Sequence, residues 1–536
     1  MKLLKFEFIN RFRIVNKFKR LNNYLFFKKK VNSNNIILVE FNAFHSDHIF
    51  FSYFSNVLAK KYNAKILGFY NFKLIVSKLK ETLIEKIKWK ISNKVNYKNF
   101  GIYRSFGTEK IFKPHISKEI EKISLKKFKI ILKKIKKKEN IYKIKINKVF
   151  LGDIIYDSYL KFNYVPTINV SDKNFKNFLK DFICLFYFWD NFFKTHVVKS
   201  VLGIHAHYSY ALPMRIAFRE KIPVYVHNEG KVFYLNQKNQ YQFSEYKYFN
   251  KIYSTFSSNQ KKEILKEGKK YIKKRILGKT GGEIGSTYIS KSSFSKKFRK
   301  KNILKKNKKI KILICTQDFF DAINVYGTFH FPDFYEWLNF LGKISNKTNY
   351  DWYIKDHPNY SGKYKKYQPF TSNTTQEIIK KYKNINYINP NTSHIDIIKN
   401  GIDYVLTVFG SVAFEYPYFN IPVITATKNI PTSVYNFNLI TKNKSHLKKI
   451  LLNLKKKKFF FNKKDLEKFY YFYFIYFNNS NFYPKYNEFN LKTNKWDKYW
   501  SVDYYDFWVN NFSKNTHQEM LNKIKDFIKS REYCLS

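Results

Sequence analysis

The sequence predicts an α/β protein with two doubly wound, Rossmann-like domains followed by a helical C-terminal extension. Three observations support this class. The chain has 536 residues, more than a single domain usually contains. Apolar strands alternate with short helices between residues 311 and 426, and a strand–helix–strand pattern at 36–69 repeats this organisation near the N-terminus.

The N-terminal half begins with the apolar run IILVEF at 36–41, which predicts a strand. A helix is expected at 49–60 and a second strand at 64–69. Lys-rich sequence at 80–150 carries Ile and Leu at three- and four-residue spacings, which indicates amphipathic helices with solvated basic faces. Further on, the pattern predicts a strand at 201–205, a helix at 211–221 and a strand at 224–227.

The C-terminal half contains the clearest alternation of strands and helices. Strands are predicted at 311–316, 352–355, 385–388, 404–408 and 423–426. Helices are predicted at 333–345, 375–383, 394–400 and 412–419. Strands that alternate with helices in this way favour a parallel sheet.

These patterns divide the chain into five parts. We expect a basic N-terminal segment at 1–30, an N-terminal Rossmann-like domain with a helical insertion at 31–290, and a linker at 291–310, where the sequence is polar and basic without periodicity. A C-terminal Rossmann-like domain follows at 311–445. Residues 446–536 form the helical extension, which we expect to pack back across both domains.

The composition is that of a globular protein with an unusual charge. Hydrophobic residues make up 44% and charged residues 26%, but 101 Lys and Arg face only 39 Asp and Glu, which gives a net charge of +62. Such a surface attracts anionic lipid, nucleotide phosphates and nucleic acid, and salt weakens this attraction. The charge is spread along the chain and no nucleic-acid-binding module is present, so a nucleic-acid-binding protein is the less favoured interpretation.

Cysteine use and hydropathy predict a cytoplasmic location. Cys184, Cys315 and Cys534 are odd in number and far apart, which suggests neither a disulfide framework nor a metal site. Charges interrupt residues 1–30 every few positions, unlike an export signal. The longest apolar runs are far shorter than the roughly 20 residues of a membrane span, so any contact with the inner face of the membrane is expected to be peripheral.

The sequence YIKDHP at 353–358 provides the strongest chemical signal. A buried strand ends in Lys355 and His357, and Pro358 then turns the chain away. Open α/β sheets bind their ligands at this carboxyl edge. A cation and an imidazole there can hold a nucleotide phosphate and stabilise charge as it leaves, although a surface turn with an incidental histidine has the same pattern.

A second signal follows about 50 residues later, in YVLTVFGSVAFE at 404–415. The strand delivers Thr407, and Gly410 and Ser411 open a helix whose first amide groups can bind an anion. Glu415 lies one turn further along the same face and can accept hydrogen bonds from ribose hydroxyls. An ordinary strand-to-helix turn remains the alternative.

With these motifs in place, the stretch from 312 to about 438 resembles bacterial surface-carbohydrate and capsule-polysaccharide biosynthesis proteins with the GT-B fold. The similar segments are CTQDFFDAINVYG, FPDFYEWLNFLGKIS, YDWYIKDHPN, GIDYVLTVFGSVAFEYPYFNIPVI and YNFN, and more loosely GDIIYDSYL and HYSYALPMRIAFREKIPVYV. The resemblance implies two Rossmann-like domains that face a cleft, and a metal-independent glycosyltransferase that needs no cofactor.

The motif order also resembles that of bacterial sialyl- and Kdo-type transferases, which carry an acidic-acidic-Gly motif, a His-Pro motif and a Ser/Thr motif. By that analogy Glu229 is the general base, His357 stabilises the donor phosphate and Ser411 hydrogen-bonds it. Asn228 departs from the first acidic position. Relatives often have histidines near the positions of Gln317 and Asn324, so full activity, or use of the same donor, is in question. Asp321 is the alternative acid or base.

Histidines of the N-terminal half form a candidate acceptor site. His45, Asp47 and His48 follow the first strand, and His205 and His207 alternate on one side of a later one, where the core and the cleft are equal alternatives for their surroundings. We expect His45, His48 and His207 to contact the acceptor. The His-x-Asp-His spacing also resembles a metal site, but no fourth ligand is evident, and we expect no metal. Gly278-Lys279-Thr280 lacks the rest of a P-loop, and no GxGxxG motif supports a dinucleotide enzyme.

The sequence therefore predicts transfer of a sugar from a nucleotide-activated donor, with a CMP-sugar slightly favoured, to a saccharide or lipid-linked acceptor. Anionic lipid at the inner membrane surface is the expected docking partner. An inactive polysaccharide-assembly partner with the same fold and a polyol-phosphate transferase remain alternatives. The sequence leaves the sugar, the acceptor, the stereochemical course and the oligomeric state undetermined.

Overall fold

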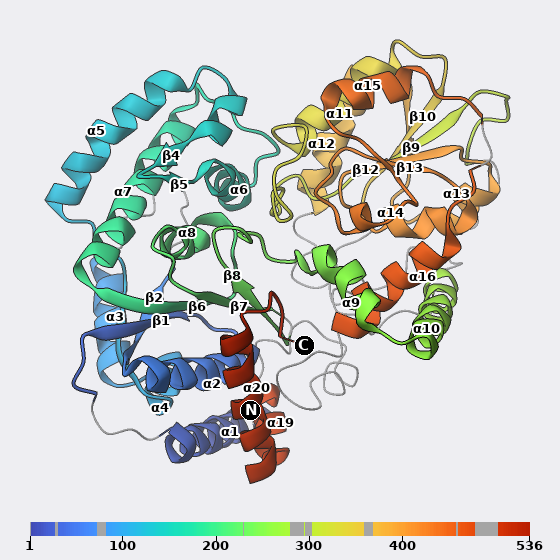
Figure 1. The fold of residues 1–536 in the computed structure, drawn as a ribbon. Coiled ribbons are helices and arrows are strands. Elements are labelled where there is room, and N and C mark those ends of the chain that lie inside the picture. The colour runs from blue at the N-terminus through green and yellow to red at the C-terminus, as the bar shows by residue number, and fades with distance from the viewer. Residues whose placement is uncertain are drawn as a thin grey trace. The chain divides into compact units, whose positions relative to one another are not determined.

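The computed structural model describes residues 2–26, 31–71, 82–228, 230–278, 294, 303–357, 368–456, 459–477 and 502–535. The chain forms two compact units (Figure 1). The N-terminal unit comprises Met1–Asn163, Asn169–Gln242 and Ser480–Ser536. The C-terminal unit comprises Tyr164–Ile168 and Phe243–Asn479.

A six-stranded sheet forms the centre of the N-terminal unit. In chain order its strands are β1 (Asn35–Phe41), β2 (Lys65–Tyr70), β3 (Thr108–Phe112), β6 (Val197–Gly203), β7 (Val224–Asn228) and β8 (Lys231–Leu235). Their spatial order is β3-β2-β1-β6-β7-β8, and only β8 is antiparallel to its neighbour. The order reverses between β1 and β6, which makes the carboxyl ends of these two strands the switch point where such sheets bind ligands.

Helices cover this sheet and account for the Lys-rich part of the sequence. They are α1 (Lys2–Phe26), α2 (His45–Tyr62), α3 (Leu83–Lys94), α4 (Asn99–Ser105), α5 (Lys118–Lys134), α6 (Gly152–Asn163), α7 (Lys173–Thr195), α8 (Leu212–Arg219), α19 (Asp503–Asn510) and α20 (Lys514–Ser530). Most residues of α2 are buried, whereas α3 buries none. The amphipathic helices predicted for 80–150 are present, and α3 and α5 are the most basic of them.

The two ends of the chain meet in the N-terminal unit. Phe18 of α1 stacks on Tyr505 of α19, with ring centroids 4.2 Å apart. The last described residues run beside β8, where the Tyr533 carbonyl accepts from the Tyr234 amide at 2.8 Å and the Leu535 amide donates to Val232 at 2.9 Å. The C-terminal segment thereby pairs with backbone groups that an edge strand would expose.

The second sheet is entirely parallel. Its strands are β9 (Lys311–Cys315), β10 (Asp351–Lys355), β11 (Ile385–Ile388), β12 (Tyr404–Thr407), β13 (Val423–Thr425) and β14 (Leu439–Ile440). Their order is β11-β10-β9-β12-β13-β14. The switch point lies between β9 and β12. Strands that are buried on both faces appear in the sequence as continuous apolar runs, and these strands were predicted from such runs.

The helices of the C-terminal unit are α9 (Phe249–Thr255), α10 (Ser258–Ile276), α11 (Phe334–Ser345), α12 (Gln368–Lys381), α13 (His394–Lys399), α14 (Val412–Glu415), α15 (Lys444–Leu452) and α16 (Lys463–Tyr471). Helices α9 and α10 belong here, although we expected residues up to 290 to join the N-terminal domain. The reason is the close packing of α10 on α16, where Gly268 lies against the backbone of Glu467.

The predicted fold class is confirmed: the chain contains two Rossmann-like α/β domains and additional C-terminal helices. The cleft between the domains stays a prediction. The extension divides between the units, since α15 and α16 belong to the C-terminal unit and α19 and α20 to the N-terminal one. Most of the expected linker at 291–310 lies outside the described residues. None of the described helices combines the length and apolar character that a membrane span requires.

Candidate functional site

Lys355 and His357 lie at the carboxyl edge of the second sheet, as the sequence predicted. Lys355 ends β10 and is buried, and its Nζ donates to the Pro390 carbonyl at 2.8 Å. Burial lowers the pKa of Lys355 to about 8, an effect that nearby negative charges oppose. Two residues later, His357 is half-buried. Of the two, His357 is the side chain with access to a ligand at this edge.

His357 belongs to a cluster that connects the β10 and β12 ends of the sheet. His394, on α13, has a pKa well below its usual value, first because it is buried and then because Lys355 and His357 lie near it. Its Nδ1 lies 2.6 Å from the Tyr416 hydroxyl. Tyr416 directly follows α14, so the segments that carry the His-Pro and Gly-Ser motifs meet around His394.

Asp356, between Lys355 and His357, holds the edge together. Its carboxylate is buried and accepts from the hydroxyls of Thr316 at 3.1 Å, Tyr387 at 3.1 Å and Thr375. Burial raises the pKa of Asp356, and these hydrogen bonds oppose the change. The partners come from the ends of β9 and β11 and from α12. Sequence reasoning missed this residue because its partners are distant in the chain.

The Gly-Ser turn after β12 has a compact geometry. The buried Thr407 Oγ1 accepts from the Gly410 amide at 3.0 Å. A Cβ at Gly410 would lie 2.7 Å from this oxygen, so the turn needs glycine here. Ser411 follows and is exposed. The helix after it is shorter than predicted, because α14 has four residues and continues as a 3-10 turn, Tyr416–Phe419.

Gln317 connects the two loops that flank the switch point of the second sheet. Its Oε1 accepts from the Phe409 amide at 3.2 Å, which ties the loop after β9 to the loop after β12. In the same loop Asp321 is exposed and Asn324 is buried. Gln317 therefore has a structural role in this chain, because it holds the two loops together.

Glu415 is a buried carboxylate with one oxygen still available. Its Oε1 accepts from Arg275 of α10 at 2.8 Å and 2.9 Å. Its Oε2 is also buried and has no hydrogen-bond partner among the residues that the structure describes. Lys355 lies close enough for the Glu415 charge to oppose the lowering of the lysine pKa. Buried polar atoms in proteins are normally paired, so this oxygen is an exception to the usual pattern.

The histidines of the N-terminal domain differ in their surroundings. His48 is fully buried, with Nδ1 2.6 Å from the Tyr505 hydroxyl and Nε2 3.2 Å from the Asn42 carbonyl, and burial lowers its pKa to about 3. His45 is half-buried, and its pKa falls to about 4 through burial. His207 is half-buried too, with its ring 4.9 Å from that of His205. His45 and His207 are the more accessible of the three predicted acceptor residues.

Asp47 and His227 form a buried pair that the sequence did not reveal. Nδ1 of His227 bonds the Asp47 carboxylate, and Nε2 accepts from the Gly230 amide at 3.2 Å. The His227 ring stacks on Phe50, with centroids 5.0 Å apart. Burial raises the pKa of Asp47, while His227 opposes the change. The pair fixes the end of β7, immediately before Asn228.

Glu40 lies at the switch point of the first sheet. Its Oε2 accepts from the Ile204 amide at 2.9 Å, across the gap between the ends of β1 and β6. Burial raises its pKa to about 7, and the hydrogen bond to Ile204 opposes the change. A carboxyl with a pKa near neutrality is a functional-site candidate. The signal available in the sequence was a single acidic residue inside an apolar strand.

Two predicted site residues, Glu229 and Pro358, lie outside the described residues.

A buried ion pair joins the two N-terminal segments GDIIYDSYL and HYSYALPMRIAFREKIPVYV. Asp153, from GDIIYDSYL, pairs with Arg215, from HYSYALPMRIAFRE, at 2.7 Å.

No family model matches the chain. No curated protein matches it either. Among solved structures, a Methanocaldococcus jannaschii UDP-GlcNAc 2-epimerase in complex with UDP-GlcNAc and UDP is 14% identical, with 81% of this chain and 97% of that chain covered and a TM-score of 0.23. A Neisseria meningitidis UDP-GlcNAc 2-epimerase bound to UDP-GlcNAc is 11% identical, with coverage of 73% and 82% and a TM-score of 0.18. The Staphylococcus aureus MnaA–UDP complex is 11% identical, with coverage of 77% and 86% and a TM-score of 0.22.

Proposed function

We propose that this protein is a glycosyltransferase that moves a sugar from a nucleotide-activated donor to a surface polysaccharide or lipid-linked acceptor. The observation that carries the proposal is the arrangement at the carboxyl edge of the second sheet. His357 and Ser411 follow strands on either side of β9. Neighbouring strands are about 4.8 Å apart, so the two residues belong to strand ends about 10 Å apart, within the reach of one nucleotide.

Each group at this edge has a proposed role toward the donor. The His357 imidazole and the Ser411 hydroxyl hydrogen-bond the phosphate, and Lys355 adds positive charge behind it. The free Oε2 of Glu415 accepts a ribose hydroxyl. Thr407, Gly410 and Gln317 keep the loop in place, and Pro358 is expected to turn the chain after His357. A CMP-sugar is the first donor to test.

The proposed reaction is a single displacement at the sugar. The acceptor oxygen bonds the anomeric carbon, and the bond from that carbon to the phosphate oxygen breaks. The electron pair leaves with the nucleotide, and a carboxylate takes the acceptor proton. Glu229 is the proposed base and Asp321 the alternative. His45 and His207 contact the acceptor, and His48 positions α2 from within the core.

The test is nucleotide release from CMP-, UDP- and GDP-sugars, with and without a saccharide acceptor. We expect His357→Ala to lower kcat by about 100-fold, the usual effect of removing one electrostatic stabiliser. Ser411→Ala lowers it less. The matched control is His446→Ala, on α15 of the same domain, which should leave the rate unchanged.

Three outcomes contradict the proposal. One is a rate that His357→Ala leaves unchanged. Another is a sugar nucleotide that changes configuration without losing its nucleotide, which identifies an epimerase. A product that retains a donor phosphate identifies a polyol-phosphate transferase.

A further inference from the structure

Helix α3 presents its apolar side to solvent, the reverse of the usual orientation. Leu83 is 73% exposed, Ile84 63%, Ile87 47% and Ile91 56%. Residues 83, 87 and 91 are four apart and share one face of the helix. A helix in a globular protein normally turns such a stripe toward the core. No residue of α3 is buried.

The opposite face of α3 attaches it to the N-terminal domain. Trp89 contacts the rings of Phe41, Tyr70 and Phe100 at 4.8–5.6 Å. One turn later, the Asn93 Nδ2 donates to the Ile111 carbonyl of β3 at 3.1 Å. The N-terminus has a capping box between Thr82 and Glu85. The helix is therefore fixed on one side, and its outward apolar stripe is a defined surface.

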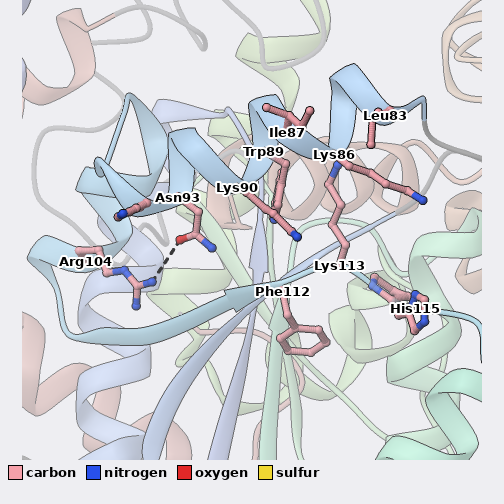
Figure 2. A pocket seen from close by; sticks show the side chains of 12 residues that line it. Leu83, Lys86, Ile87, Trp89, Lys90, Asn93, Arg104, Phe112, Lys113 and His115 are labelled. Carbon is pink, nitrogen blue, oxygen red and sulfur yellow. Dashed lines mark hydrogen bonds between the residues drawn. The ribbon is translucent and has the colours of Figure 1, made fainter.

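Basic side chains border this stripe. Lys88, Lys90 and Lys94 lie on α3, with Glu85 as the one acidic residue of the helix. Beside α3 is a pocket of about 770 Å³ (Figure 2). It is lined by Leu83, Lys86, Ile87, Trp89, Lys90, Asn93, Lys94, Arg104, Phe112, Lys113, Pro114 and His115. No acidic residue is among them.

Two of the basic groups in the pocket are held in place. Arg104 donates to the Asn93 side chain at 3.1 Å and to the Thr108 carbonyl at 2.9 Å. Nζ of Lys113 lies 4.2 Å from the centroid of the Trp89 ring. These contacts hold the two positive charges in the pocket, which Leu83 and Ile87 of the stripe also line.

We propose that α3 and this pocket form a docking surface for an anionic phospholipid membrane. The apolar stripe enters the interface between headgroups and acyl chains, and the lysines and Arg104 meet lipid phosphates. The charge argues against a second copy of this chain, because two basic faces repel each other. The stripe argues against nucleic acid, because a phosphate backbone does not cover exposed Leu and Ile. The inference does not depend on sugar transfer.

The experiment is flotation of the full-length protein with vesicles of phosphatidylcholine alone or mixed with phosphatidylglycerol. We expect binding to the anionic vesicles only, and weaker binding as salt increases. Lys90→Ala/Lys94→Ala should lower partitioning by about 30-fold, the loss of two lysine–membrane attractions. Ile87→Asp/Ile91→Asp should lower it by more than about tenfold.

Matched controls separate this surface from general charge. Lys523→Ala/Lys525→Ala removes two exposed lysines from α20, and Leu452→Asp/Phe460→Asp places two carboxylates at exposed apolar positions of the other unit. Both should bind as the unchanged protein does. Because Cys184, Cys315 and Cys534 are buried, Ile91→Cys can be labelled selectively with an environment-sensitive dye. Its emission should shift to the blue on anionic vesicles, whereas a label at Lys523→Cys should not respond.

Equal partitioning of the α3 variants and the unchanged protein would overturn the proposal. A label at position 91 that does not respond to anionic vesicles would also overturn it. So would a Lys90→Ala/Lys94→Ala variant that no longer binds single-stranded RNA but still binds the vesicles. Circular dichroism on each variant confirms that a loss of binding does not reflect unfolding.

Discussion

At the scale of single residues, buried charges in this chain are compensated by partners far away in the sequence. Asp153 and Arg215 are both almost fully buried, and Asp153 also accepts from the Tyr241 hydroxyl at 3.1 Å and the Ile154 amide at 2.8 Å. Such a pair adds little net stability compared with an apolar pair, but it is costly to break, because the remaining charge has no water around it.

Asp153→Ala should therefore lower the free energy of unfolding by about 3–5 kcal/mol, since the Arg215 guanidinium is left buried and unneutralised. Urea denaturation measures this change. Glu263→Ala, which breaks an exposed pair with Lys266, is the control and should cost less than about 1 kcal/mol. If Asp153→Ala and Glu263→Ala lowered the free energy of unfolding equally, water would have to reach Arg215 in the folded protein.

Glu40 makes stability depend on pH. Its pKa is raised to about 7 from 4.5 by burial, so the folded protein prefers the protonated acid. The stabilisation is complete below the unfolded pKa of 4.5 and is lost as the pH rises through about 7. Glu40→Gln keeps an acceptor for the Ile204 amide but does not ionise.

Relative to Glu40→Gln, the unchanged protein should lose roughly 3 kcal/mol of stability between about pH 5 and about pH 8. Urea titrations at several pH values give this difference directly. Glu109→Gln, at an exposed position, serves as the reference. A difference that stays constant, or that grows in the opposite direction, would show that Glu40 is ionised throughout.

The sequence predicted those candidate residues whose place in the fold depends only on neighbouring residues in the chain. Lys355, His357 and Ser411 follow apolar strands, so their place at the sheet edge could be deduced from neighbouring residues. Glu40, Asp356 and His227 could not be recognised in the same way. His227 and Asp47 are 180 positions apart, and only the folded sheet brings them together.

At the scale of elements, the predicted strands of the second sheet are confirmed, because apolar β-branched runs between polar loops have few other interpretations. The two-residue β14 was missed, since so short a strand has no pattern. The helix predicted at 412–419 is α14 followed by a 3-10 turn that includes Pro417. Proline lacks the amide that would continue the α-helical hydrogen bonds.

Helix α10 illustrates how packing decides the unit to which an element belongs. A Cβ at Gly268 would lie 2.1 Å from the Glu467 carbonyl oxygen of α16, so the two helices approach as only glycine allows. Gly268→Ala should lower stability by about 2 kcal/mol despite the better helix propensity of alanine.

Thermal unfolding is the measurement, and Lys262→Ala, at an exposed position of α10, is the control. If Gly268→Ala stabilised the protein, as alanine does in an unpacked helix, the close contact between α10 and α16 would be wrong. This contact could not be predicted from the sequence, because the residues that flank Gly268 in the chain form only a Lys-rich pattern.

At the scale of the whole molecule, each unit has its own hydrophobic core. One core contains side chains of α2, β1, α19 and α20, and the other contains side chains of β9, β12 and β13. The members of each core come from a single unit. A chain of this kind is not expected to unfold in one step.

We therefore expect two unfolding transitions in calorimetry, and the variants identify them. Asp153→Ala lowers the transition temperature of the N-terminal unit, and Gly268→Ala lowers that of the C-terminal unit.

A nucleotide that binds beside His357 stabilises only the folded state of its own unit, by about 2.7 kcal/mol at a concentration 100 times its Kd. It should raise the transition that Gly268→Ala lowers and leave the other in place. Glu415→Gln weakens both the Arg275 pair and the ribose contact, so it should reduce the shift. If the nucleotide instead raised the transition that Asp153→Ala lowers, the donor site would lie at the first sheet. The polar groups of that site would then be Glu40 and the Asp47–His227 pair.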